Sequence, residues 1–208
     1  MSNVSVFQTA GLPAVSSLST SLKALTDAAP GAGGGVAILK MDKIGCWVFG
    51  ADATECEDGS KWAVNPFSFV HGFIAWGNRE VLGEKMVGVS QPLPELDPAP
   101  AGAEKGWETQ LGMSLKCISG EDSGLEVRYV TTSLGGKRAV QELAVALSEQ
   151  VDKDQTKPVP VVTLNRGSYP HKNYGKVLIP VFDIVQFISL EGAEEESPKA
   201  ARRRRIAA

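Results

Sequence analysis

Short apolar or alternating runs predict a series of β-strands from Val36 onward. They are "GVAILKM", "GCWVFGAD", "KWAVNPFSFVHGFIAWG" and "KMVGVSQ", separated by Gly, Asp and Asn. Two more runs, "GWETQLGMSLKCIS" and "GLEVRYVTTS", flank "GEDSG", which is typical of a turn. Between the two groups, "QPLPELDPAPAGAE" contains four prolines. It predicts an exposed connection, because proline has no N–H to donate to a sheet.

The period of the pattern changes once, at "GGKRAVQELAVALSEQV", which predicts a helix. Its apolar face would consist of Ala139, Val140, Leu143, Ala144 and Leu147. After it, "KPVPVVTLNRG" and "KVLIPVFDIVQFI" predict two more strands, with residues 168–175 as an exposed hairpin loop. Pro180 predicts that the last strand lies at a sheet edge or carries a bulge.

Several strands, one helix and two further strands follow the order of an OB-fold, a five-stranded barrel with its helix between strands three and four. The sequence therefore predicts a mainly β, OB-fold-like domain over residues 36–190. A β-sandwich with one inserted helix fits the same order. Residues 1–35, rich in Ser, Ala, Thr and Gly, predict a flexible N-terminal arm, and residues 191–208 a disordered charged tail.

Charge is distributed unevenly along the chain. The net charge of −3 argues against a generically basic DNA-coating protein, and because residues 191–208 carry +1, the remainder carries −4. Within that acidic remainder, Gln155 to Val181 contains no Asp or Glu but has Lys157, Arg166, Lys172 and Lys176. This segment predicts a local positive surface, and chance clustering on a solvated strand face is the alternative.

Cysteine usage and the N-terminus favour a cytoplasmic protein, in the host cytoplasm if the protein is viral. Cys46, Cys56 and Cys117 are odd in number and lack CxxC spacing, as expected of free thiols. The N-terminus has no basic start followed by a long apolar stretch, so no secretory signal is expected. No apolar run approaches the roughly 20 residues that span a bilayer, so no membrane association is expected.

Motifs for catalysis are missing. His71 and His171 are not near a nucleophile motif, and GxSxG, HExxH and a complete phosphate-binding loop are absent. The cysteines and histidines lack the close pairs of a zinc site. We therefore expect no enzyme activity, metal or cofactor. A magnesium-dependent enzyme of nucleic-acid metabolism stays a third hypothesis because Asp52, Glu55, Glu57 and Asp58 cluster, although solvation of a polar turn explains them.

Cations that neutralise phosphates and flat side chains that stack on bases are what single-stranded nucleic-acid binding needs. Aromatic residues and lysines interleave in "SYPHKNYGK", and "SLGGKRA" opens the helix, where backbone amides and Lys137 can meet a phosphate. An ordinary glycine turn is the alternative there. Phe67, Phe69 and Phe73 are assigned to the core. The candidate contacts are Tyr169, His171, Lys172, Tyr174, Lys176, Arg166, Trp107, Lys137, Arg138 and Trp62.

Two segments, "VVTLNRGSYPHKNYGKVLIPVFDIVQFI" and "LEVRYVTTSLGGKRAVQEL", resemble the C-terminal part of bacteriophage and prophage single-stranded DNA-binding proteins. The resemblance implies an OB-fold that coats single-stranded DNA in phage replication or recombination, with no catalysis. It also implies a DNA-facing loop that contains Tyr169, His171, Lys172, Tyr174 and Lys176. A phage structural or assembly protein of β-sandwich type, such as a capsid or tail accessory, is the alternative.

The C-terminal tail departs from that family's pattern. Such proteins commonly finish in an acidic tail that recruits replication or recombination proteins, whereas here "EGAEEES" is followed by "KAARRRRIAA". It is therefore open whether the tail recruits a partner and what Arg202–Arg205 do. The sequence also leaves open whether the protein is a homodimer.

Overall fold

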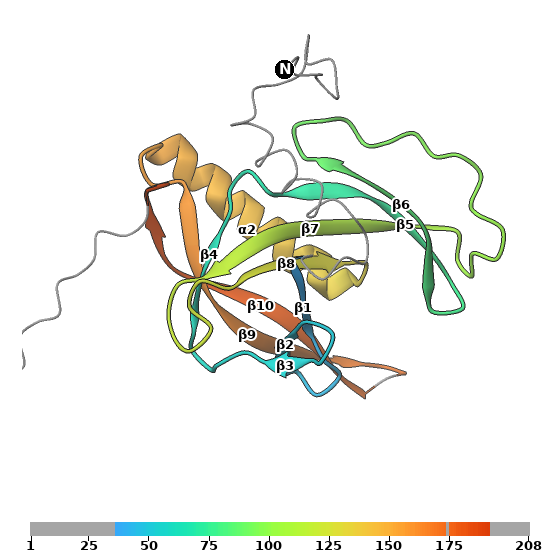
Figure 1. Ribbon diagram of the computed structural model, residues 1–208, viewed down its shortest axis with the longest axis horizontal. Helices are drawn as coiled ribbons and strands as arrows, with labels where there is room; N and C mark the ends of the chain where they lie inside the picture. Colours follow the sequence, from blue (N-terminus) through green and yellow to red (C-terminus); the bar gives the residue numbers. More distant parts are fainter. Residues whose placement is uncertain (1–35, 174, 192–208) are drawn as a thin grey trace, which may run out of the picture. The chain divides into compact units, whose positions relative to one another are not determined.

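The computed structural model describes residues 36–173 and 175–191, which fold into ten strands and one helix (Figure 1). The predicted mainly β class is confirmed. The predicted N-terminal arm, Tyr174 and residues 192–208 lie outside the described residues. The elements are β1 (Ala37–Met41), β2 (Trp47–Phe49), β3 (Thr54–Glu55), β4 (Lys61–Val64), β5 (Val70–Gly77), β6 (Glu80–Gly88), β7 (Trp107–Cys117), β8 (Glu126–Thr131), α2 (Leu134–Lys153), β9 (Val159–His171) and β10 (Gly175–Ile188).

The strands form one sheet in the order β10-β9-β4-β7-β8-β1-β2-β3, and β5 and β6 extend it alongside β7. Every pairing is antiparallel except that of β1 with β8. The sheet is not closed by hydrogen bonds, since β10 and β3 are the ends of this path. A closed five-stranded barrel is therefore not what the strand pairing forms. As predicted, the helix precedes the last two strands.

Helix α2 begins at an N-cap, Ser133, whose Oγ accepts a hydrogen bond from the Gly136 amide at 3.1 Å. The predicted apolar face is confirmed, with four of its residues buried and Ala144 packed against the core. Near its C-terminal end, Lys153 lies where a cation favours the helix dipole. No helix in the described residues combines the length and the hydropathy needed to cross a membrane.

Three aromatic side chains join strands that are not hydrogen-bonded to one another. The ring centroids of Trp47 and Tyr129 lie 5.8 Å apart, those of Trp47 and Phe182 5.3 Å, and those of Tyr129 and Phe182 5.2 Å. Such separations are those of favourable tilted ring pairs. The cluster connects β2, β8 and β10, so it holds the end strand β10 against the distant part of the open sheet that contains β8 and β2.

Two aromatic assignments from the sequence are wrong. Trp62 cannot stack on a base, because it is 0% exposed and its Nε1 donates to Ser60 Oγ at 2.9 Å. Phe67, assigned to the core, is 78% exposed. It lies in a turn between β4 and β5, where Asn65 Oδ1 accepts the Phe67 amide at 3.0 Å, so it leaves the strand alternation. Phe69 is buried as predicted, and Phe73 is half-buried.

The predicted hairpin of β9 and β10 is confirmed, but its loop is shorter than residues 168–175. β9 continues through His171, which is paired with Gly175, so residues 168–171 belong to the strand. Gly175 has a φ of 70°, which lets the chain reverse within a short turn without strain. Pro180 lies on β10, an end strand of the sheet, as predicted.

A substitution at Gly136 tests how closely the start of α2 packs against Tyr129 of β8. A Cβ there would lie 2.7 Å from Tyr129 Oη and 2.9 Å from Ser133 Oγ. We expect Gly136→Ala to lower the free energy of unfolding, since overpacking costs about 1–3 kcal/mol and alanine's better helix propensity returns at most about 1 kcal/mol. Urea denaturation would measure the change. Gly88→Ala is the control, since the nearest atom there is Ser90 Oγ at 3.8 Å, and it should not destabilise the protein. A Gly136→Ala variant as stable as the parent would contradict the described packing.

Candidate nucleic-acid interface

The β9–β10 hairpin separates its aromatic residues from its cations. Opposite residues of paired strands share a face, and successive residues alternate between faces. Tyr169 is paired with Val177 and His171 with Gly175, which defines an aromatic face. Lys176, paired with Pro170, belongs to the opposite face, together with Arg166, paired with Pro180. Arg166 and Lys176 therefore do not share a surface with Tyr169 and His171.

On the aromatic face, Tyr169 is 40% exposed and its ring centroid lies 6.4 Å from that of His171, in a T-shaped arrangement. His171 Nδ1 accepts the Asn173 amide at 3.1 Å. Lys172 is exposed at the turn, where Figure 1 shows the hairpin extending beyond its neighbouring strands. Tyr174, the other predicted stacking residue, lies outside the described residues.

The N-terminal end of α2 lies beside this face. A Cβ on Gly135 would lie 2.5 Å from Cγ2 of Ile179, which is paired with Gly167 on the same face as Tyr169. The first turn of the helix contains no acidic residue, but Lys137, half-buried, and Arg138, exposed, follow directly. Helix N-termini carry partial positive charge. The structure thus places the first turn of α2 against Ile179 on the aromatic face.

Arg166, one of the predicted DNA contacts, makes a hydrogen bond within the protein. Its Nη1 donates to the carbonyl oxygen of Ile44 at 3.1 Å, and its Cδ lies close to Gly45. It therefore ties the turn between β1 and β2 to β9 and lies at the edge of a pocket. Lys176 is exposed on the same face of the hairpin.

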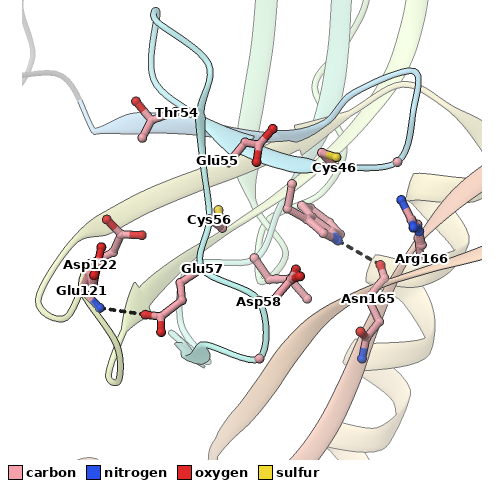
Figure 2. Close-up of a pocket in the computed structure, with 14 residues that line it drawn as sticks. Cys46, Thr54, Glu55, Cys56, Glu57, Asp58, Glu121, Asp122, Asn165 and Arg166 are labelled. Carbon is pink, nitrogen blue, oxygen red and sulfur yellow. Dashed lines mark hydrogen bonds between the residues drawn. The ribbon is translucent and has the colours of Figure 1, made fainter.

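This pocket has a volume of about 810 Å³ and is strongly acidic (Figure 2). Its one cationic side chain is Arg166, and Glu57 Oε2 accepts the Glu121 amide at 2.8 Å. Glu55, Glu57 and Asp58 of the predicted acidic cluster line it, and Asp52 does not. Its carboxylates repel a phosphodiester strand, so this surface is electrostatically unfavourable for a nucleic-acid backbone. The carboxylates are Glu55, Glu57, Asp58, Glu121 and Asp122.

The pocket also contains two thiols, Cys46 and Cys56. Burial, and then the charge of Asp122, raise the pKa of Cys56 from 9.0 to about 12. Cys56 is therefore a protonated, weakly reactive thiol near neutral pH. Among residues 36–173 and 175–191, no three His, Cys, Asp or Glu side chains are arranged to hold a metal ion.

Trp107, another predicted stacking residue, is half-buried and already engaged. Its Nε1 donates to the carbonyl oxygen of Asp97 at 2.9 Å, and Lys85 Nζ lies 5.8 Å from its ring centroid. Lys85, on β6, was missed from the sequence because it lies far along the chain from Trp107. Phe67 was missed as an exposed aromatic, although "NPFS" contains a turn signal that points to it.

Comparison with models of protein families, with curated proteins and with solved structures finds no match to this chain.

Cys56 reactivity tests the described pocket. At pH 8 we expect iodoacetamide to alkylate native Cys56 roughly 40-fold more slowly than the same residue in the urea-unfolded chain. A pKa of about 12 instead of 9.0 lowers the thiolate fraction about a thousandfold, and the greater nucleophilicity of a more basic thiolate recovers part of the loss. Peptide mass spectrometry would follow each cysteine. Equal rates in the native and unfolded protein would refute a half-buried Cys56 flanked by the Asp122 carboxylate.

Proposed function

We propose that this protein binds single-stranded DNA without sequence preference and without catalysis. The observation that carries the proposal is the hairpin's aromatic face. Tyr169, exposed, and His171 lie there beside the acid-free first turn of α2. The whole stretch from Gln155 to Val181 contains no carboxylate side chain that would repel phosphates.

The aromatic rings and the cations would contact different parts of a DNA strand. A base stacked on an aromatic ring gains about 1–3 kcal/mol, with little dependence on its identity. Lys172 at the turn and Arg138 at the helix start can each neutralise a phosphate. A strand that runs along the aromatic face from Lys172 toward α2 would meet stacking groups and cations in succession. Lys176, on the opposite face, is not part of this path.

The strand pairing supports an OB-like arrangement as part of the same proposal. If β4 and β5 together are the first strand, then β7, β8, β9 and β10 are the second to fifth, and α2 lies between the third and fourth. The β9–β10 turn then corresponds to the loop between strands four and five, one of the two loops with which OB-folds bind oligonucleotides. Contacts of Trp47 and Tyr129 with Phe182 would replace the closing hydrogen bonds.

A role in phage replication or recombination, in the host cytoplasm, is proposed from the family resemblance. So is the recruitment of a partner protein by the C-terminal tail. A structural or assembly protein of a phage is the second candidate, and one observation favours it. Val81 and Leu82 are 50% and 38% exposed on β6, which pairs with β5 and with no other strand of the described residues. An edge strand with exposed apolar residues is a surface on which protein partners can add a strand.

Titration with oligothymidylate, followed by tryptophan fluorescence at two salt concentrations, tests the proposed function. We expect saturable binding whose affinity falls with salt, with a log–log slope of about −0.7 per neutralised phosphate. Absence of binding at low salt, or an affinity that salt leaves unchanged, would reject the proposal and favour the assembly protein.

Variants of the hairpin separate stacking from charge. Tyr169→Ala should weaken binding roughly 5- to 160-fold, the equivalent of about 1–3 kcal/mol, and leave the salt slope unchanged because a neutral ring releases no counterions. Lys172→Ala should make the slope shallower by about 0.7.

Lys153→Ala is the matched control for these variants. It removes an exposed cation at the C-terminal end of α2, about 28 Å along the helix from Leu134 at a rise of about 1.5 Å per residue. It should bind like the parent. Thermal melting checks the fold, since loss of an exposed Tyr169 costs little stability. If Tyr169→Ala and Lys172→Ala both bind DNA as tightly as Lys153→Ala, the hairpin is not the interface.

A further inference from the structure

The connection between β6 and β7 is fastened to the sheet at both ends. We call residues 91–104 the strap. At its start, His71 Nε2 and the carbonyl oxygen of Gln91 are 2.9 Å apart. At its end, the Glu104 amide donates to the carbonyl oxygen of Trp76 at 2.9 Å, and the Asn78 amide donates to Glu104 Oε1 at 3.2 Å. Both fastenings are to β5 or the turn that follows it, so the strap lies along the β5–β6 hairpin.

The middle of the strap covers a cation and an aromatic ring. Lys85 Nζ lies 2.6 Å from Asp97 Oδ2 and 3.0 Å from the carbonyl oxygen of Glu95. The Asp97 carbonyl accepts the indole N–H of Trp107. Gly83 lets this arrangement form, because a Cβ there would lie 2.8 Å from the Trp107 ring and 3.3 Å from Pro100.

The strap places a carboxylate and two backbone carbonyls against a lysine–tryptophan pair. A lysine next to a tryptophan ring is a pair that holds a phosphate and stacks a base in single-stranded binding sites. In this structure a carboxylate takes the position of the phosphate on Lys85. The strap has three carboxylates, Glu95, Asp97 and Glu104, and no Lys or Arg, so its charge resembles that of a short phosphodiester segment.

The contacts that hold the middle of the strap are weak ones. The side chains of Lys85 and Asp97 are 29% and 79% exposed, and ion pairs open to solvent contribute little stability. Leu93 and Leu96 are 50% and 46% exposed, so they bury little apolar surface. Gly102, with a φ of 89°, gives the chain a conformationally permissive residue near the fastened end.

From this geometry we infer that Lys85 and Trp107 form a second contact for single-stranded DNA, and that Asp97 of the strap occupies its phosphate position until a DNA strand displaces it. The inference rests on the proposed function and extends it to a surface outside the β9–β10 hairpin. The strap acts as an intramolecular competitor. It lowers the affinity for short or weakly held strands.

Two isosteric variants test the competition. Asp97→Asn removes the carboxylate that contacts Lys85. Glu95→Gln makes the same change of net charge two residues away, where the contact to Lys85 is made by the backbone carbonyl and not by the side chain. In oligothymidylate titrations, Asp97→Asn should bind about 2- to 5-fold more tightly than the parent, as expected for loss of a weak ion pair. Its salt slope should be steeper than the parent's, because binding to the parent also breaks the Lys85–Asp97 ion pair, a step that salt favours. Glu95→Gln should change neither quantity measurably, and Lys85→Ala should abolish the gain of Asp97→Asn.

A measurement on the unmodified full chain complements the variants and does not depend on their folding. The indole N–H resonance of Trp107, assigned with Trp107→Phe, should shift and lose its protection from hydrogen exchange when oligothymidylate saturates the protein. If the parent binds DNA but this resonance stays unchanged, or Asp97→Asn and Glu95→Gln bind alike, the strap inference is overturned while the proposed function stands. If neither the parent nor Asp97→Asn binds DNA, both fall.

Discussion

The fold depends on contact among Trp47, Tyr129 and Phe182, because their strands belong to distant parts of an open sheet. Hydrogen bonds alone leave β10 and β3 as ends of the sheet. The three rings bring β2, β8 and β10 together, and a hydrogen bond of 2.9 Å from Trp47 Nε1 to the carbonyl oxygen of Asn165 reinforces the contact. Burial raises the pKa of Tyr129 from 10.0 to about 12. The stability contributed by its neutral phenol is therefore complete below pH 10 and is lost as the pH rises through 12.

Because the sheet is held in this way, β9 serves two surfaces of opposite character. Arg166 lines the acidic pocket from one face of the strand, whereas Tyr169 and His171, further along the same strand, lie on the opposite, aromatic face. The alternation of side chains and the outward extension of the hairpin produce this separation. A polyanion can approach the aromatic face and the start of α2 without meeting the pocket's carboxylates.

Local patterns in the sequence predicted the parts of the fold that local physics determines. The period of about 3.6 found helix α2, and the apolar runs around "YPHKNYG" found the β9–β10 hairpin. The run "KWAVNPFSFVHGFIAWG" led to the wrong assignments of Trp62 and Phe67, because it contains two strands and a turn. Trp62 alternates inward with Val64, while Asn65 turns Phe67 outward.

The sites proved harder to predict than the elements, because they combine residues from distant segments. The acidic pocket joins Glu57 to Glu121, and the strap brings Asp97 onto Lys85 and Trp107. No periodicity relates these positions. The separation of aromatic residues from cations on the hairpin depends on the pairing register, which the letters of the loop do not specify.

Backbone amide NMR with a saturating oligothymidylate tests the central claim most directly, because it compares the aromatic face of the hairpin with the acidic pocket in one sample. The account predicts that chemical-shift changes are largest at Tyr169, His171 and Lys172 and in the first turn of α2, and that Glu55 to Gly59 in the acidic pocket stay unchanged. Changes centred on the pocket, or no changes at all, would contradict it.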